Sequence, residues 1–579
     1  MLSDQEIERW KRDLDSGNRY REAEAAERLA EAFSSDDTDY NIIVCDKFWD
    51  EIDTANDYIE VSGTIPRNKA PQATLTLRSD HHLVPTFRTC EQTMVGVIIE
   101  TGGISEAFYV KHHREILGED GAWKHVINLV GIYDILNYLV IWPSWFLPIQ
   151  AQPFSHAVYA APLCTAIEAA AAEQALRIQS GMWEFVNNAL SLNPDVRAWF
   201  GTVLQGLKRD GKPSTILKTP LYVVRTGILR DGSPPYVKTV RMTTVGQMID
   251  EITPAYGVDV RVYLWRPGMP QPDRWAHLEV PTYVMTVKDR SQIEGPTKTI
   301  VDSAIRGTVD ALGSILGNVL SPLLNPGKKY VPDGMHIAPA IGLDFVMPYA
   351  LLVTPDNVIT EDGEVVRERS PLITCEICHN TPLGWQHIIG GKSPKWLNDL
   401  INAFFKYIID AVMIVIGFTG VPSNILDGFL NDSFLAFQLI QHYARRNDVG
   451  PYHPAIEVFT STNSAPYNIE ALFQFIQVLW NSRGYTTAIA TFRGQNGPYK
   501  LGRDIFPGAL MTLVYASRTQ LFTDYIELVS FKANRTTREL TVQMGDGKPL
   551  EHSSVQLRRN ISETWAAINT VSLAPQSGG

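Results

Sequence analysis

The sequence predicts an α+β, multidomain fold in which β-rich regions flank a large, mainly helical and apolar insertion. The first observation is length, because 579 residues exceed what one hydrophobic core normally holds. The second is a period-two alternation of apolar and polar residues at 57–61 and 73–77, which is typical of half-buried strands. The third is a series of apolar i, i+4 stripes between 298 and 450, which is typical of helices.

The domain boundaries follow changes in these patterns. Ser3 and Glu6 have the capping-box spacing of a helix start, and alternation with period two begins at Tyr40. A glycine-containing turn at 101–103 indicates a β-hairpin, and an alanine-rich helix is predicted at 163–180. The predicted parts are a charged helical arm (1–38), a first β-rich domain (39–155), a helical connector (156–210), a mixed α/β region (211–297), the helical apolar insertion (298–450), a C-terminal β-rich domain (451–550) and a tail (551–579).

Further elements are predicted inside these parts. Strands are expected at 123–130, 221–226 and 258–265, and a helix is expected at 133–141. The segment at 142–148 is apolar and interrupted by proline, which favours a rigid corner over a strand.

Two features define the apolar insertion. Gly313 and Gly317 form a G-x-x-x-G pattern on a predicted helix, which lets two helix backbones approach closely. A helical hairpin is predicted at 394–446, beginning after Ser393 with Pro394 at the first helical position. The hairpin residues expected to contact a membrane or a subunit interface are Phe404, Ile408, Val412, Ile416, Phe429, Phe434, Phe437 and Ile440.

Three environments are open to this hairpin. A spanning helix needs about 18–20 consecutive apolar residues, and the uninterrupted run at 411–417 is much shorter. Lys406, Asp410 and Asp427 also interrupt the apolar faces, which argues against constitutive spanning. Burial at a subunit interface is the default interpretation. The remaining hypothesis is a hairpin that is hidden in one state and inserted into lipid in another.

Composition and charge exclude some classes of function. Hydrophobic residues make up 45% of the chain and charged residues 20%, as in a packed globular protein. The formal net charge is -12, and no dense block of Lys and Arg provides a nucleic-acid footprint. Sequence-specific reading of DNA or RNA is therefore not expected, whereas an acidic channel would let DNA pass without holding its phosphates.

The cysteines and the N-terminus indicate where the chain folds. Five cysteines in a long chain do not form a disulfide framework. The first residues lack a basic region followed by an apolar one, so no secretory signal is expected. We therefore expect the chain to be made in a reducing cytoplasm.

One motif contains a cysteine pair. Cys375, Cys378 and His379 match the C-x-x-C-H spacing that attaches c-type haem, but haem attachment requires an exported chain. A zinc site would use His379 or His387 as well, but structural zinc takes four ligands, usually as two spaced pairs. Partial alternation of apolar and polar residues at 371–379 favours a strand with two half-buried thiols.

Other motifs do not lead to an active site. The run at 390–393 is similar to the end of a phosphate-binding loop, but Gln386 stands where that motif requires glycine. The adjacent pairs at 81–82 and 112–113 are histidines, and neighbours on a strand point to opposite faces, so one pair does not chelate easily. We predict no catalytic, cofactor-binding or metal-ligating residues. A cell-wall hydrolase remains an alternative because acidic residues are plentiful.

Several short runs, taken together, resemble the minor tail proteins of siphophages that infect mycobacteria and related actinobacteria. The likeness extends over most of residues 40–550, and the order and spacing of the runs make it specific. The runs are DYIEVSGTIP (57–66), GIYDILN (131–137), WP (142–143), FLPIQ (146–150), LEVPTYVM (278–285), KDRS (288–291), LGRDIFPG (501–508), FTDYI (522–526) and MGDGK (544–548).

The resemblance implies a structural virion protein at the tail tip, similar to baseplate hub proteins whose β-barrel-like domains form a trimeric ring capping the tail tube. It implies a homotrimer in contact with the distal tail ring protein, the tape-measure protein and other minor tail proteins, with genomic DNA passing through without sequence recognition. It implies host attachment and genome ejection, and no catalytic residue or cofactor. The alternative is a hub whose apolar hairpin inserts into the host membrane.

Overall fold

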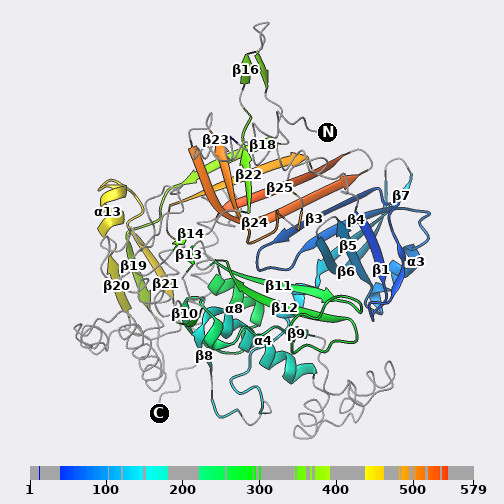
Figure 1. The fold of residues 1–579 in the computed structure, drawn as a ribbon, viewed down its shortest axis with the longest axis horizontal. Coiled ribbons are helices and arrows are strands. Elements are labelled where there is room, and N and C mark those ends of the chain that lie inside the picture. The colour runs from blue at the N-terminus through cyan, green and yellow to red at the C-terminus, as the bar shows by residue number, and fades with distance from the viewer. Residues whose placement is uncertain are drawn as a thin grey trace. The chain divides into compact units, whose positions relative to one another are not determined.

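Strands dominate the fold. The computed structural model describes residues 12, 40–101, 104–118, 121–147, 152–154, 156–179, 221–253, 257–290, 293–294, 299–300, 344–345, 349–355, 357–359, 365–367, 372–390, 437–441, 443–461, 482, 484–493, 499, 501–502, 504–515, 520–534 and 537–545 (Figure 1). Strands make up 50% and helices 16% of the described residues.

The prediction of a large, mainly helical apolar insertion is wrong. Between 298 and 450 the described elements are seven strands and one short helix, namely β14 (Asp344–Phe345), β15 (Ala350–Val353), β16 (Asn357–Ile359), β17 (Val365–Arg367), β18 (Leu372–Asn380), β19 (Gln386–Gly390), β20 (Phe437–Gln441) and α13 (Tyr443–Val449). Residues 437–441 were assigned to the second helix of the hairpin, but they pair with β19 along its whole length. A short apolar run fits either a helix or a strand, and here the neighbouring strand decides.

No helix among the described residues is long and apolar enough to cross a bilayer.

In the described part of the chain, a 13-stranded sheet joins the strands at 41–131 with those at 485–545. The orange C-terminal strands and the blue N-terminal strands lie side by side where β24 pairs with β3 (Figure 1). The order is β18-β22-β25-β24-β3-β4-β7-β6-β5-β1-β2, with β23 beside β24 and β15 beside β23. The bounds are β1 (Asn41–Cys45), β2 (Glu51–Thr54), β3 (Glu60–Pro66), β4 (Gln72–Arg78), β5 (Gly96–Thr101), β6 (Ile104–Leu117), β7 (Trp123–Gly131), β22 (Tyr485–Arg493), β23 (Leu510–Tyr515), β24 (Gln520–Asn534) and β25 (Arg538–Gly545).

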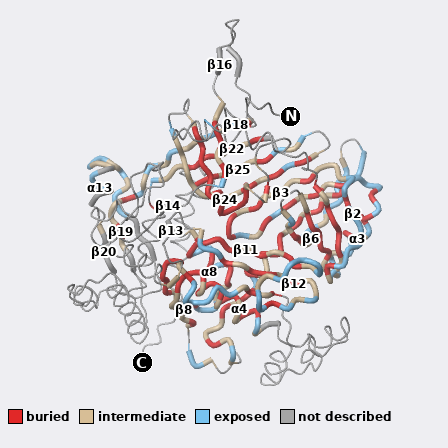
Figure 2. The backbone as a smooth tube through the Cα atoms, in the orientation of Figure 1, coloured by how far each residue is buried: buried red, intermediate tan, exposed pale blue. Residues whose placement is uncertain are grey.

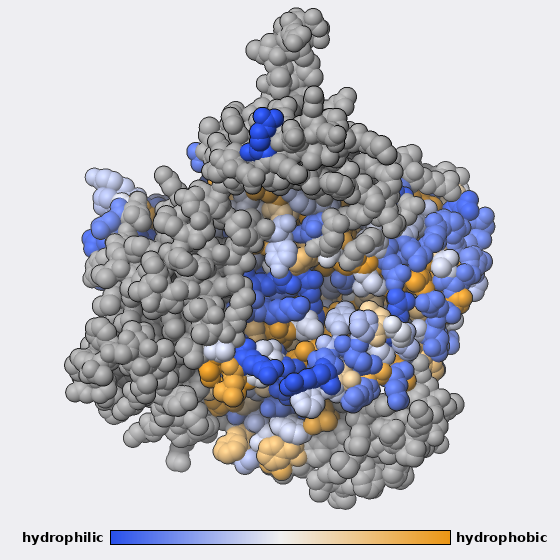
Figure 3. All heavy atoms as spheres, in the orientation of Figure 1, coloured by the Kyte–Doolittle hydropathy of each residue, from blue (hydrophilic) through white to orange (hydrophobic). Residues whose placement is uncertain are grey.

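Alternation along these strands builds one core. In β4 the buried residues are Ala73, Leu75 and Leu77, and the residues between them are less buried. The same cluster of buried side chains includes Val529 of β24 and Val542 of β25, so both halves of the sheet share it. Figure 2 shows buried backbone, in red, along strands of both halves. Hydrophilic side chains occupy much of the described face seen in Figure 3. The apolar side chains that alternate inward are the main stabilising contribution to this sheet.

A second sheet is made by the middle of the chain. It has the order β11-β12-β9, with β9 parallel to β12, and α4 packs against β8, β9 and β12. The side chain of Thr244 accepts a hydrogen bond from the backbone of Gln247, which begins α8 as a capping box. The bounds are β8 (Ala157–Pro162), α4 (Leu163–Gln179), β9 (Leu221–Val223), β10 (Pro235–Val240), α8 (Val245–Ile252), β11 (Val258–Trp265) and β12 (Thr282–Asp289).

Most local predictions in these two sheets are confirmed. The hairpin around 101–103 is β5 and β6, the helix at 163–180 is α4, and the strand at 258–265 is β11. The helix predicted at 133–141 is a short 3-10 helix, η2 (Ile132–Asn137), which follows β7 directly. The length of its apolar pattern was overestimated because Leu139 and Ile141 are buried without being helical.

The chain divides into two compact units. The first covers 1–378, 404–419 and 487–545, and the second covers 379–403, 420–486 and 546–579. The first contains the second sheet and the large sheet, except for the last two residues of β18 and the first two of β22. In the second unit β19 lies between β20 and β21 (Glu457–Ser461). There Arg445 Nη1 donates a hydrogen bond to Ser482 Oγ at 2.9 Å and lies 3.4 Å from His387 Nε2.

The first prediction concerns Gly63 in β3. A Cβ at Gly63 would lie 2.6 Å from the ring of Phe531 on β24 and 2.9 Å from the carbonyl oxygen of Gln72. We expect Gly63→Ala to lower the free energy of unfolding by about 1–3 kcal/mol, measured by chemical denaturation. Phe531→Leu should relieve part of that strain in the double variant. Ser62→Ala, one position away, should change stability by less than about 0.5 kcal/mol, and an equal loss there would contradict the packing explanation.

The second prediction concerns Glu168 on α4, whose carboxylate accepts hydrogen bonds from the backbone N–H of Thr226 at 2.9 Å and from its hydroxyl at 2.6 Å. Burial raises the pKa of Glu168 to about 7. The folded state therefore binds a proton that the unfolded state has released, so this group's contribution to stability falls as pH rises from about 4.5 to 7.

Between pH 5 and 8, the free energy of unfolding should fall by about 2 kcal/mol more in the wild type than in Glu168→Gln. The measurement is chemical denaturation of both proteins across this pH range. Exposed Glu91→Gln is the matched control and should keep the wild-type profile. If the free energy of unfolding changed with pH in the same way in wild type and Glu168→Gln, ionisation of Glu168 would not destabilise the fold, and the prediction would be wrong.

Candidate functional site

The structure describes few of the residues predicted to contact a membrane or an interface. Phe437 and Ile440 lie on β20, where they pair in register with Gly390 and His387. The others lie outside the described residues; they are Gly313, Gly317, Phe404, Ile408, Val412, Ile416, Phe429 and Phe434.

The cysteine pair lies on a strand, as predicted. Cys375 and Cys378 are half-buried on β18, and burial raises the pKa of Cys375. The histidines considered as zinc ligands have other neighbours in the second unit: His379 Nδ1 lies 3.0 Å from Thr486 Oγ1, and His387 Nε2 lies 3.5 Å from Ser482 Oγ.

The adjacent histidine pairs have different environments. His81 and His82 lie in the turn after β4, where their rings stack at 4.7 Å and each contacts its own aspartate. His112 and His113 lie on β6, and only His113 faces His125 of β7. In neither adjacent pair are the two rings directed toward a common ion position.

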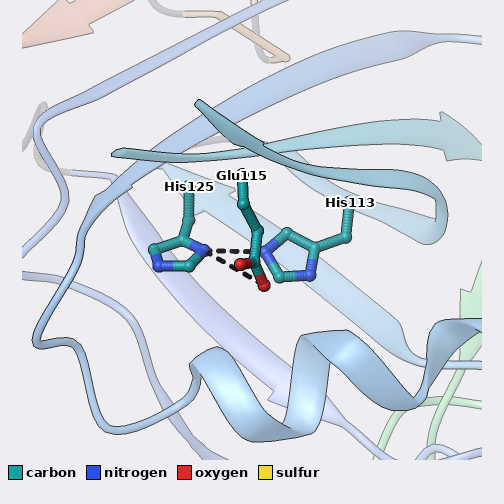
Figure 4. A group of neighbouring side chains, drawn as sticks. All are labelled: His113, Glu115 and His125. Atoms are coloured by element: carbon teal, nitrogen blue, oxygen red, sulfur yellow. Dashed lines mark hydrogen bonds and ion pairs between the residues drawn. The ribbon is translucent and has the colours of Figure 1, made fainter. Parts of the chain in front are cut away.

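A cluster of His113, Glu115 and His125 was not predicted. In Figure 4 the two imidazole rings and the carboxylate converge from the paired strands β6 and β7. His113 Nε2 lies 3.0 Å from His125 Nδ1, and His125 Nδ1 lies 3.9 Å from Glu115 Oε1. In the described part of the chain these three are the group of His, Cys, Asp and Glu side chains close enough to hold one metal ion.

The surroundings lower the pKa of two groups in this cluster, His113 and Glu115, for different reasons. Burial, and then the neighbouring His125, lower the pKa of His113, so its imidazole is neutral at neutral pH. Arg88 Nε donates a hydrogen bond to Glu115 Oε1 at 2.6 Å and lowers the pKa of that carboxyl. The sequence signal for the cluster was the spacing of His113 and Glu115, two apart on one strand, but only the register of the hairpin brings His125 beside them.

The seam between the two halves of the large sheet is the candidate site for an architectural function. Strands β3 and β24 pair antiparallel from Glu60 with Asn534 to Pro66 with Leu528. The backbone N–H of Arg67 continues the ladder by donating to the carbonyl of Glu527 at 2.8 Å.

An ion pair between buried Arg67 and partly buried Glu527 closes one end of this seam. Arg67 Nη1 donates to Glu527 Oε1 at 2.7 Å, across 460 positions of sequence. The side chain of Arg67 is only 5% exposed, and its guanidinium lies 4.5 Å from the ring centre of Tyr525. Burial alone would lower the pKa of Arg67, but the charge of Glu527 and the neighbouring Tyr525 raise it. The guanidinium therefore remains charged although it is buried, because the carboxylate of Glu527 balances its charge.

Asn68, the residue after Arg67, connects the second sheet to the seam. Asn68 Nδ2 donates to the carbonyl of Val258 at 2.9 Å, and Asn68 Oδ1 accepts from the N–H of Val260 at 2.7 Å. The hydroxyl of Tyr133 donates to the carbonyl of Asn68 at 2.7 Å. Asn68 has a φ of 55°, a left-handed conformation that asparagine tolerates. Its side-chain amide thus forms the same pair of hydrogen bonds with β11 that the backbone of a neighbouring strand would form.

Asp259 makes a second connection between the sheets. Its carboxylate accepts hydrogen bonds from Arg261 Nε at 2.9 Å and Arg290 Nε at 3.1 Å. Both guanidinium groups lie over the ring of Phe506, and Arg261 also donates to the carbonyl of Pro507 at 2.7 Å. The C-terminal half of the large sheet is thereby held against β11 and β12.

The third prediction tests the ion pair of buried Arg67 with Glu527. Glu527→Leu leaves Arg67 without its carboxylate, so we expect a loss of about 3–5 kcal/mol in the free energy of unfolding, measured by denaturation. The double variant Arg67→Met with Glu527→Leu should recover most of this loss, because no buried charge then remains. Lys532→Met, which breaks an exposed pair with Glu60 between the same two strands, should cost at most about 1 kcal/mol. Equal losses for the two pairs would contradict the assigned role of burial.

Comparisons with known proteins identify the family. A family model described as Siphovirus ReqiPepy6 Gp37-like protein matches residues 41–546, while no curated protein matches the chain.

Solved structures show similarity at low identity. The tail protein from Neisseria meningitidis MC58 is 9% identical, with 88% of this chain and 97% of that chain covered and a TM-score of 0.37. The prophage MuSo2 43 kDa tail protein from Shewanella oneidensis is 8% identical, with 87% and 98% covered and a TM-score of 0.37. Prophage tail protein gp18 from Listeria monocytogenes EGD-e is 10% identical, with 90% and 98% covered and a TM-score of 0.34.

The family match extends over most of the chain, from the first strand of the large sheet to its last. It confirms the resemblance to siphophage tail proteins that the sequence runs indicated. The chain belongs to the Siphovirus ReqiPepy6 Gp37-like family, a family of phage tail proteins.

Proposed function

We propose that the chain is a structural, non-catalytic component of the phage tail tip, where it forms the hub ring that caps the tail tube as a homotrimer. The observation that carries this proposal is the pairing of β3 with β24, which makes one sheet from β-rich segments at opposite ends of the chain. A continuous sheet with a shared core resists bending, which suits a wall that must hold its shape while other components attach and DNA passes.

The ends of the sheet offer surfaces for assembly. In the described part of the chain, the strand order ends at β2 on one side and at β18 on the other. All four residues of β2 are exposed. An edge strand presents backbone N–H and C=O groups to a further strand, and pairing between symmetry-related copies would cover these groups in a closed ring.

The expected neighbours follow from this position. We propose contacts with the distal tail ring protein, the tape-measure protein and other minor tail proteins, and a role in host attachment and genome ejection, with a mycobacterial or related host. The net charge of -12 supports a passage that does not retain DNA, because an acidic wall makes no counterion-releasing contacts with phosphates.

The fourth prediction tests copy number and place. Native mass spectrometry of the purified chain should give three times the 64.7 kDa mass of the chain, and a cryo-EM map of intact tail tips should show three copies around the tail axis. Copies located away from the axis, or a monomer both in solution and in the particle, would contradict the hub proposal and indicate a decorating or receptor-binding protein.

A further inference from the structure

We propose that His113, Glu115 and His125 form a binding site for a divalent transition-metal ion, with Zn²⁺ as the ion whose chemistry fits best. The site lies on the β6–β7 hairpin, apart from the seam that carries the proposed tail function. It is independent of that function, so each is tested separately.

The register of the hairpin places the three side chains on one face. Glu115 stands directly opposite His125, and His113 is two residues before Glu115 on the same strand. Side chains two apart on a strand share a face, and cross-strand partners lie about 4.5–5.5 Å apart at Cβ. A register shift between Val110 and His112 precedes the cluster and sets this alignment.

The distances between the three ligand atoms are close to those that a bound zinc ion requires. Zn²⁺ binds imidazole nitrogen at about 2.0–2.1 Å in a tetrahedron, so two such nitrogens lie about 3.3 Å apart. His113 Nε2 and His125 Nδ1 are 3.0 Å apart, and all three ligand atoms lie within 4.8 Å of one another. Small side-chain rotations would therefore admit the ion. Two histidines and one glutamate leave a fourth position for water, as in known His₂Glu zinc sites.

The surroundings hold the imidazoles in place. His125 is only 3% exposed, and the ring of His113 lies 6.5 Å from that of Phe87. Both rings are therefore oriented before an ion arrives, which lowers the ordering cost of binding. Transition metals of the zinc type favour imidazole ligands, whereas Mg²⁺ and Ca²⁺ favour sites made of oxygen atoms.

One neighbour opposes the ion. Arg88 donates to the same Glu115 oxygen that lies nearest to His125. Its guanidinium would repel a cation and competes with it for the Glu115 carboxylate. The side chain of Arg88 is 58% exposed, so it has room to move into solvent. This competition predicts a direction of change that a merely structural histidine cluster would not show: removing the charge of Arg88 should tighten binding.

The experiment titrates ZnCl₂ into the full-length chain after EDTA treatment and removal of the chelator, with isothermal calorimetry for stoichiometry and the visible absorption of bound Co²⁺ as a second readout. We expect one saturable ion per chain, binding at least tenfold weaker in His113→Gln and in Glu115→Gln, and severalfold tighter in Arg88→Gln. His112→Gln is the matched control, because His112 is an exposed neighbour that pairs with Asn128 on the opposite face. It should bind like wild type.

Two results would overturn the proposal. One is the absence of a saturable Zn²⁺ site in the wild-type chain. The other is equal affinity in wild type, His113→Gln and Glu115→Gln, which would place the ion elsewhere. Circular dichroism of each variant establishes that it is folded, and Glu115→Gln keeps the test decisive if a histidine variant does not fold, because Glu115 is exposed.

Discussion

The pairing of residues 60–66 with residues 528–534 is the constraint on which the rest of the first unit depends. These segments contribute the two central strands through which the N-terminal and C-terminal halves of the large sheet become one. The ladder satisfies backbone groups that would otherwise be buried without partners, and the ring of Phe531 fills the space that Gly63 leaves open. Neither half would bury its apolar face fully without the other, because they share one core.

Polar and charged side chains then determine how the second sheet is attached. Arg67 and Asn68 follow β3 directly, and they reach Glu527 on one side and the backbone of β11 on the other. Asp259 and its two arginines connect β11 and β12 to the segment at 506–508. Within the seam the Arg67 guanidinium depends on Glu527, because removing that carboxylate would leave a buried charge without its partner. The seam therefore also sets the position of the second sheet.

The sequence was sufficient where the local pattern and the local structure agree. The alternation at 73–77 and the glycine turn at 101–103 led to correct strands, and the alanine-rich run led to α4, because short-range contacts determine these elements. Residues 437–441 were misassigned because the apolar run is too short to separate a helix from a strand, and β19, some fifty residues earlier, decides. The same limit applies to His125, which joins His113 and Glu115 through hairpin register, and to Arg67, whose partner is 460 positions away.

That separation has a consequence for synthesis of the chain. At about 5–20 residues per second, a ribosome needs roughly 20–90 s to proceed from Arg67 to Glu527. During that time the N-terminal strands exist without β24, and β3 is an open edge beside incompletely covered apolar side chains. Contacts at such long range close late and slowly, because the intervening chain must lose its entropy first. Until β24 emerges, the exposed edge of β3 is therefore available for pairing with strands other than its own partner.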